Sequence, residues 1–206
     1  MKNPLRYQMT EYDCGPSSML NAVSVLFERE EIPPEILRSI MLYCLDCFGA
    51  DGASGKRGTS CTAMMFLSNW LNGFGQTGSL PISSQYLAGE SVNFSQNSRL
   101  RDALLRGGVA VVRLDFEGWH YVVLTGLQGE NVRLFDPYYR EEPFDDPNLQ
   151  MVWDHPTEYN RIVPISYLEK TAIEPYAFGP AEGREAVLLF NDRTALTEEN
   201  TVEYMI

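Results

Sequence analysis

The chain has 206 residues, of which 44% are hydrophobic, and this is enough for a substantial core in one domain. Its formal net charge of -12 and sequence pI near 4.6 argue against nucleic acid or an anionic membrane surface as a partner. The charged N-terminus is not followed by an apolar signal segment, and no apolar run approaches membrane-spanning length. These features predict a soluble, cytoplasmic protein whose oligomeric state the sequence does not determine.

The cysteines and histidines limit the possible chemistry. The four cysteines all lie in the first third of the chain, at Cys14, Cys44, Cys47 and Cys61. Reduced thiols are expected, since a chain of this size does not need disulfides. The only histidines are His120 and His155, which excludes a histidine-rich metal site. Cys44 and Cys47 fall within one expected helix and have no second thiol pair, so core packing is favoured over a redox pair. We predict no metal and no cofactor.

Helical spacing of apolar residues dominates the first half of the sequence. Four helices are predicted, at about residues 16–28, 34–46, 61–72 and 99–106. The apolar face of the second contains Ile36, Leu37, Ile40, Met41 and Cys44. Thr59-Ser60 and Ser98 can cap the third and fourth helices, and Gly73 is expected past the end of the third.

The segment 48–58 contains four glycines in eleven residues and is predicted to be a surface loop beside a cleft. It does not match a phosphate-binding loop, because five residues separate Gly49 from Gly55 and Arg57 replaces the expected Ser or Thr. A second polar stretch, residues 73–97, is expected to contain short extended pieces at best.

The second half of the sequence has strand-like runs. Strands are predicted at residues 109–114, 119–125, 131–135 and 186–190. The first three are joined by short connections, so they should be antiparallel neighbours. The expected fold is α+β in a single domain, with a helical part at about 1–107 packed on an antiparallel sheet at about 108–190. A polar tail at 191–206 should be partly disordered.

Cys14 lies at the predicted start of the first helix, followed by Gly15 and Pro16. The free N–H groups and the helix dipole at that point favour a negative thiolate over a neutral thiol. Pro16 suits the first turn, because it has no N–H to lose. We therefore interpret Cys14 as a candidate catalytic nucleophile.

A cysteine nucleophile requires a base, and the base requires a third group that orients it. His120 begins a predicted strand, and Asp136 ends the next one. Antiparallel pairing would place the carboxylate beside the imidazole. Each residue alone is more simply explained as structural, His120 as a partly buried strand residue and Asp136 as a turn residue before proline. His155 lies in a loop and is interpreted as a surface or packing residue.

Several segments, in this order, resemble the papain-like peptidases that remove double-glycine leader peptides. They are Gln8, residues 13–16 (DCGP), residues 58–60 (GTS), residues 119–126 (WHYVVLTG) and residues 135–137 (FDP). The resemblance covers about residues 5–140. It implies a papain-like cysteine peptidase fold and a peptide or protein substrate.

In that family a cysteine attacks, a histidine acts as base and acid, an aspartate orients the histidine, and a glutamine donates to the oxyanion. The resemblance assigns these roles to Cys14, His120, Asp136 and Gln8, while Asp13 is read as structural. Two features depart from the pattern. The Cys-Gly-Ser/Ala-Cys motif of papain itself is absent. Such leader peptidases are also typically fused to a membrane exporter, whereas this sequence has no exporter and no membrane segment, so a stand-alone form is expected.

Two alternatives remain open from the sequence. The same residues could transfer the acyl group to an amine or thiol instead of water, as in phytochelatin synthases and some antibiotic-pathway acyltransferases, which resemble this fold. The chain could also be a peptide-binding module without turnover, although Cys14, His120 and Gln8 are all present.

Overall fold

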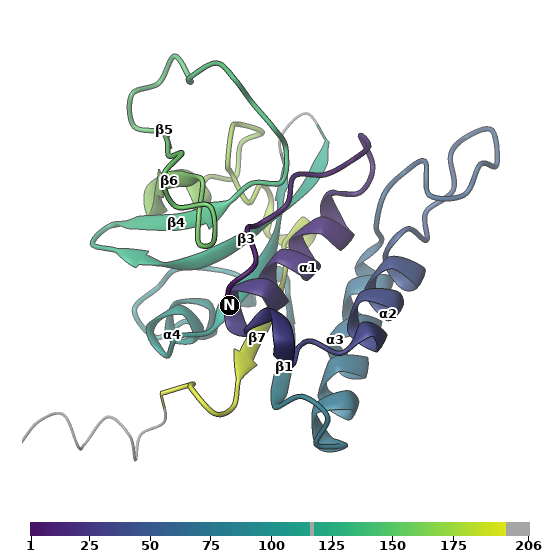
Figure 1. Ribbon diagram of the computed structural model, residues 1–206. Helices are drawn as coiled ribbons and strands as arrows, with labels where there is room; N and C mark the ends of the chain where they lie inside the picture. Colours follow the sequence, from purple (N-terminus) through teal and green to yellow (C-terminus); the bar gives the residue numbers. More distant parts are fainter. Residues whose placement is uncertain (116–117, 197–206) are drawn as a thin grey trace, which may run out of the picture.

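The computed structural model describes residues 1–115 and 118–196. Its centre is one antiparallel sheet in the order β1-β7-β2-β3-β4-β6-β5, with helices on both faces (Figure 1). The strands are β1 (Ile82–Ala88), β2 (Val109–Asp115), β3 (Trp119–Gln128), β4 (Asn131–Phe135), β5 (Gln150–Met151), β6 (Arg161–Pro164) and β7 (Glu185–Asn191). The mixed helix and antiparallel-sheet class agrees with the expectation. Most of the predicted polar tail, from residue 197 on, lies outside the described residues.

On one face of the sheet lie α1 (Cys14–Leu26) and α3 (Cys61–Gln76), and α2 (Pro34–Cys44) packs on these two helices. The apolar face predicted for the first helix is buried, with Met19, Val23, Leu26 and Phe27 in the core. These side chains pack against alternate residues of the central strands, including Val111, Val123 and Val187. The first turn of α1 therefore lies close to the edge where β3 begins, which is where His120 is located.

The opposite face of the sheet carries α4 (Arg99–Leu105) and the short α5 (Ile165–Leu168). Ser98 caps α4 as predicted, since its Oγ accepts a hydrogen bond from the Arg101 N–H at 3.1 Å. Three single-turn 3₁₀ helices complete the structure, namely η1 (Arg29–Glu31), η2 (Gly89–Ser91) and η3 (Ala181–Gly183). Both faces of the central strands are thus buried, each under its own layer of helices.

The 73–97 segment is more ordered than the sequence suggested. It contains β1, which pairs with β7 along seven residues at the edge of the sheet. The third helix also continues past Gly73 to Gln76. Both differences have one cause, because α3 packs on β1 and its last turn comes very close to Ile82.

The second helix is shorter and less buried than predicted. Leu37 and Met41 are exposed, and only one narrow stripe, Ile36, Ile40 and Cys44, enters the core. The helix ends at Cys44, so Cys47 lies beyond it and the two thiols do not share a helix. Cys44 is fully buried, as its place on the apolar stripe predicted, and burial raises the pKa of its thiol.

The two glycines of α3 should respond oppositely to alanine. At Gly73 an added Cβ would meet nothing within 4 Å, so Gly73→Ala should raise the free energy of unfolding by about 0.5–1 kcal/mol through helix propensity. At Gly75 the Cβ would lie 1.9 Å from the carbonyl oxygen of Ile82, so Gly75→Ala should lower it by about 1–3 kcal/mol. Urea unfolding of both variants tests this difference, and two changes of the same sign would contradict the close approach of α3 to β1.

Candidate active site

Cys14 is the first residue of α1 and is 7% exposed. The loop before it is held by the carboxylate of Asp13, which accepts hydrogen bonds from the N–H groups of Met9 at 2.9 Å and Thr10 at 2.6 Å. Asp13 is therefore structural in this state. Its contacts fix the path of the 8–13 segment, which carries Gln8 toward the start of the helix.

Gly15 allows the end of the glycine-rich loop to pack beside Cys14. A Cβ at Gly15 would lie 2.2 Å from the Oγ1 of Thr59, so a larger residue would displace Thr59. A Cβ at Gly58 would likewise meet the carbonyl oxygen of Tyr12 at 3.3 Å. Thr59, which lies just before α3, thus packs directly against the first turn of α1.

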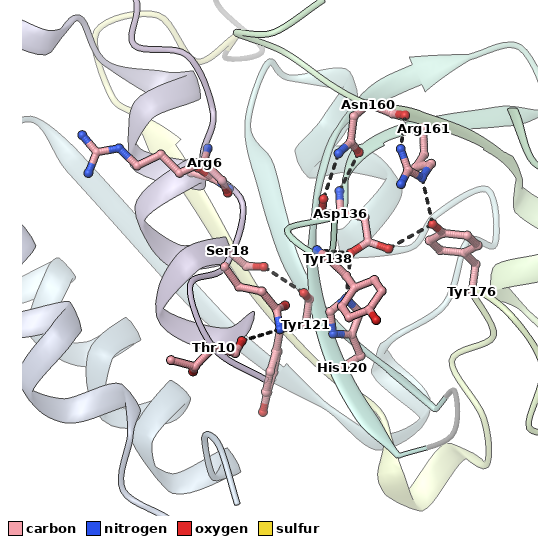
Figure 2. A network of polar contacts seen from close by, with 12 residues as sticks. Arg6, Thr10, Ser18, His120, Tyr121, Asp136, Tyr138, Asn160, Arg161 and Tyr176 are labelled. Atoms are coloured by element: carbon pink, nitrogen blue, oxygen red, sulfur yellow. Dashed lines mark hydrogen bonds and ion pairs between the residues drawn. The ribbon is translucent and has the colours of Figure 1, made fainter. Parts of the chain in front are cut away.

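The structure brings His120 and Asp136 together. His120 is the second residue of β3, Asp136 directly follows β4, and the two strands are antiparallel neighbours. The imidazole Nε2 lies 2.7 Å from Asp136 Oδ1 (Figure 2). Nε2 is thereby committed to the carboxylate, which leaves Nδ1 as the ring nitrogen available to a nucleophile.

The environment of His120 favours the imidazolium. Burial of the ring works against its charged form, but the charge of Asp136, the hydrogen bond to Asp136, and the neighbouring Cys14 thiol outweigh it and raise the pKa of His120 to about 10. His120 therefore interacts with both Cys14 and Asp136. At neutral pH the arrangement holds the imidazole protonated.

Asp136 is held by a hydrogen-bond network that no sequence pattern predicts. Its Oδ1 also accepts from the Tyr138 N–H at 2.8 Å, and its Oδ2 accepts from the Tyr176 hydroxyl at 3.0 Å. The side chain of Asn160 pairs with both backbone groups of Asp136, each at 2.8 Å. Burial works to raise the pKa of Asp136, but His120, the Tyr138 N–H and the charge of Arg161 hold it below its usual value. The carboxylate therefore stays charged and correctly oriented.

Tyr176 and Arg161 form the outer part of this network. Arg161 is almost fully buried, and its Nε donates to the Tyr176 hydroxyl at 3.2 Å. Figure 2 shows the resulting chain from Arg161 through Tyr176 to Asp136. Among the described residues other than glycine, Tyr176 alone has a positive φ, 62°. A strained backbone at this point indicates that the contacts of its side chain determine the local conformation.

Removing the Tyr176 hydroxyl should therefore destabilise the protein. Tyr176→Phe leaves Arg161 Nε without its acceptor and Asp136 Oδ2 without a donor, so we expect the free energy of unfolding to fall by about 1–3 kcal/mol. The matched control is Tyr167→Phe, since the Tyr167 hydroxyl bonds Asp146 at 2.7 Å nearer the surface. Urea denaturation measures both. Equal losses in the two variants would contradict a special role for the buried network.

Gln8 lies next to this group but is already partly engaged. Its backbone N–H donates to the Pro137 carbonyl at 2.9 Å, and its Nε2 donates to the Thr10 carbonyl at 2.8 Å. Its Oε1 is buried and has no hydrogen-bond partner in the described part of the chain. An amide nitrogen carries two N–H donors, so one is used by Thr10 and the second remains for a further acceptor.

A cavity of about 460 Å³ opens beside the imidazole. Its lining includes Gln8, His120, Asp136 and Tyr138, together with Arg140 and Phe144 from the segment between β4 and β5. Of the described residues, neither Cys14 nor any of 49–58 lines it. The glycine-rich loop thus approaches Tyr12 through Gly58, just before α1, and does not form a wall of this cavity.

The remaining cysteines and the second histidine lie apart from the site. Burial and the nearby Asp46 raise the pKa of the Cys47 thiol, while Cys61 is exposed at the start of α3. His155 stacks on Tyr159, with ring centroids 4.6 Å apart, as expected for a packing histidine. Within residues 1–115 and 118–196, no three His, Cys, Asp or Glu side chains gather in a way that could hold a metal ion.

Comparisons with known proteins add little to this geometry. No family model matches the sequence, and no curated protein matches it. Among solved structures, the chain is similar to a double-glycine motif protease from an AMS/PCAT transporter, determined in complex with the leader peptide. The identity is 14%, the match covers 91% of this chain and 89% of that chain, and the TM-score is 0.43. A likeness this weak carries no argument about function.

None of the described helices is both long and apolar enough to cross a bilayer.

Proposed function

We propose that the protein is a cysteine peptidase with a papain-like fold, formed by residues 1–206 as one domain. Cys14 is the nucleophile, His120 the base and acid, Asp136 the residue that orients His120, and Gln8 an oxyanion donor. The observation that supports the proposal is the 2.7 Å contact between His120 Nε2 and Asp136 Oδ1, because it leaves Nδ1 available to the neighbouring Cys14 at the start of α1.

The first half of the reaction uses each of these groups. The Cys14 thiolate attacks the carbonyl carbon of the substrate, and a C–S bond forms while the carbonyl oxygen becomes an oxyanion. The second N–H of Gln8 Nε2 and the Cys14 backbone N–H donate to that oxygen. The imidazolium of His120 then gives its Nδ1 proton to the leaving nitrogen, the C–N bond breaks, and a thioester remains on Cys14.

The second half returns the enzyme to its starting state. Neutral His120 takes a proton from water, and the resulting hydroxide attacks the thioester carbon. The C–S bond breaks, the acid leaves, and the thiolate and imidazolium are restored. Asp136 keeps the ring orientation through both halves, because its two oxygens are held by Tyr138 and Tyr176.

Gln8 supplies a prediction specific to the oxyanion. Gln8→Ala should lower kcat about 10²–10³-fold with little change in KM, because the lost hydrogen bond strengthens only as the oxyanion forms. Gln85→Ala is the matched control, since Gln85 is exposed on β1 away from the site. Steady-state kinetics on one peptide measures both. A raised KM with unchanged kcat would instead make Gln8 a substrate-binding residue.

The proposed function is tested by searching for the thioester. A mixture of synthetic peptides is incubated with the protein, quenched in acid, and analysed for new peptide termini and for the intact protein mass. We expect new termini and a mass increase that maps to Cys14. Added glycinamide distinguishes the outcomes, since amide products would indicate transfer to an amine. Absence of any Cys14-dependent product would leave the peptide-binding module as the better explanation.

A further inference from the structure

The cavity beside His120 has the size and location of a substrate subsite. Its volume of about 460 Å³ falls within the roughly 300–1,000 Å³ that is usual for ligand pockets. His120 and Asp136 form part of its wall, whereas Cys14 does not. A molecule in this cavity would therefore contact the imidazole without contacting the thiol.

The chemistry of the proposed reaction decides which part of a substrate lies there. Cys14 keeps the acyl part, and His120 gives its proton to the leaving nitrogen. The residue that follows the scissile bond must accordingly lie against His120. Since the cavity is bounded by His120 and not by Cys14, it lies on the side of the leaving group.

Polar and apolar groups contribute similarly to the lining of the cavity. Its apolar and aromatic residues are Leu114, Trp119, Tyr138, Phe144, Pro175 and Tyr176. Trp119 is 62% exposed and Tyr138 is 57% exposed, although large aromatic side chains are usually buried more deeply. Exposed aromatic rings at the edge of a cavity are frequent anchor points for binding.

The exposed ring of Trp119 is held in place before any ligand binds. The Arg113 guanidinium lies over it, with its central carbon 3.6 Å from the ring centroid. Arg113 is itself buried, 3.1 Å from a carboxylate oxygen of Glu185, and donates to the Gly183 carbonyl at 3.0 Å. The buried ion pair therefore restricts the orientation of the exposed tryptophan ring. Stacking of a ligand on this ring would cost little side-chain entropy, because the ring is already ordered.

The charged groups of the cavity are balanced. Arg140 lies over the Phe144 ring at 4.4 Å and donates to the Glu142 carbonyl at 2.7 Å, and Glu11 contributes a carboxylate to the lining. Arg161 is occupied by the Tyr176 hydroxyl and by the nearby charge of Asp136. Both guanidinium groups thus already have partners within the chain, which favours an uncharged side chain in the cavity.

We infer that this cavity is a leaving-side subsite that takes an aromatic or large aliphatic side chain from the residue after the scissile bond. The inference rests on the proposed function and adds a substrate preference to it. Stacking between Trp119 and Tyr138 would hold the incoming side chain, and the same contact would place the leaving nitrogen next to His120.

Binding of product-side peptides tests the inference without turnover. The peptides are Phe-Ala-Ala-amide and Gly-Ala-Ala-amide, each with a free N-terminus, titrated into the protein by NMR. We expect the phenylalanine peptide to bind about tenfold tighter. Trp119→Ala and Tyr138→Ala should each reduce that ratio severalfold. Trp153→Ala is the control, since Trp153 is also exposed, at 55%, but does not line the cavity.

Cleavage of a matched peptide pair separates this inference from the proposed function. The two substrates differ only in having Phe or Gly after the scissile bond. Cys14-dependent cleavage without preference for Phe, or equal binding of the two product peptides, would overturn the subsite. Preferential binding of the phenylalanine peptide without any Cys14-dependent cleavage would overturn the proposed function, and the leaving-side assignment with it.

Discussion

Cys14→Ala is expected to lower kcat/KM for peptide cleavage about 10⁴-fold or more, with no change in the circular dichroism spectrum. Without the thiol no thioester can form, and the oxyanion donors and His120 have no covalent intermediate to act on. The side chain is small and lies at the beginning of α1, so its removal should leave the core intact. Activity and spectra measured on the same preparation test this.

Cys61→Ala provides the matched control for that experiment. Cys61 is the first residue of α3, as Cys14 is of α1, but it is exposed. Its replacement should leave the rate within about twofold of wild type. A large loss in Cys61→Ala together with retained activity in Cys14→Ala would show that the reactive thiol has been assigned to the wrong helix.

Asp136→Asn is expected to lower kcat about 10³–10⁴-fold. The amide keeps the shape of the side chain and can still accept from the Tyr138 N–H, but it no longer holds the imidazolium by charge. The pKa of His120 should therefore fall from about 10, by about 1–3 units. The chemical shift of the His120 ring protons against pH measures this directly. An unchanged titration would contradict the assignment of Asp136 as its partner.

The same pair makes stability depend on pH. Because the folded pKa of His120 is raised to about 10, its contribution is fully present below its unfolded value of about 6.5 and is lost as pH rises through the folded value. The pKa of Asp136 is lowered, so its contribution is present above about 3.9 and is lost on acidification. The difference in the free energy of unfolding between wild type and Asp136→Asn should thus be largest between about pH 4 and 6.5. Asp145→Asn, at an exposed carboxylate, is the control.

Local signals account for the parts of the fold that the sequence predicted. The helix that begins at Cys14 shows regular apolar spacing, Ser98 caps its helix, and the strands around His120 have short connections that require antiparallel pairing. In each case the determining contacts lie within a few residues along the chain.

The strand β1 could not be predicted in this way, because the polar residues Ser83, Ser84 and Gln85 interrupt its apolar pattern. Ser84 is buried, and its backbone N–H and carbonyl are both bonded by the side chain of Asn72, at 2.6 and 2.5 Å. Its hydroxyl lies 2.8 Å from that of Ser68. At Ser84, polar groups from α3 therefore replace the apolar contacts that are typical of a buried strand residue. These hydrogen bonds join different elements of the fold, so local sequence patterns do not predict them.

In the candidate site, too, some residues could be predicted from local sequence and others could not. Cys14, His120 and Asp136 stand in recognisable local sequence, at a helix start, a strand start and a strand end. Tyr176 and Asn160 carry no such signal. They reach Asp136 from positions 40 and 24 residues away, within segments that look irregular. The surroundings that keep the carboxylate charged are long-range contacts, which a single sequence does not reveal.

The central claim, that Cys14 and His120 act as a pair, is tested most directly by alkylation. Iodoacetamide is applied between pH 5 and 9, and the labelled peptide containing Cys14 is quantified by mass spectrometry in wild type and His120→Ala. An ordinary thiol, with a pKa of about 8.5, reacts slowly at pH 6. The account predicts rapid labelling of Cys14 at pH 6 in wild type and at least about tenfold slower labelling in His120→Ala. Equally slow labelling of both proteins at pH 6 would contradict it.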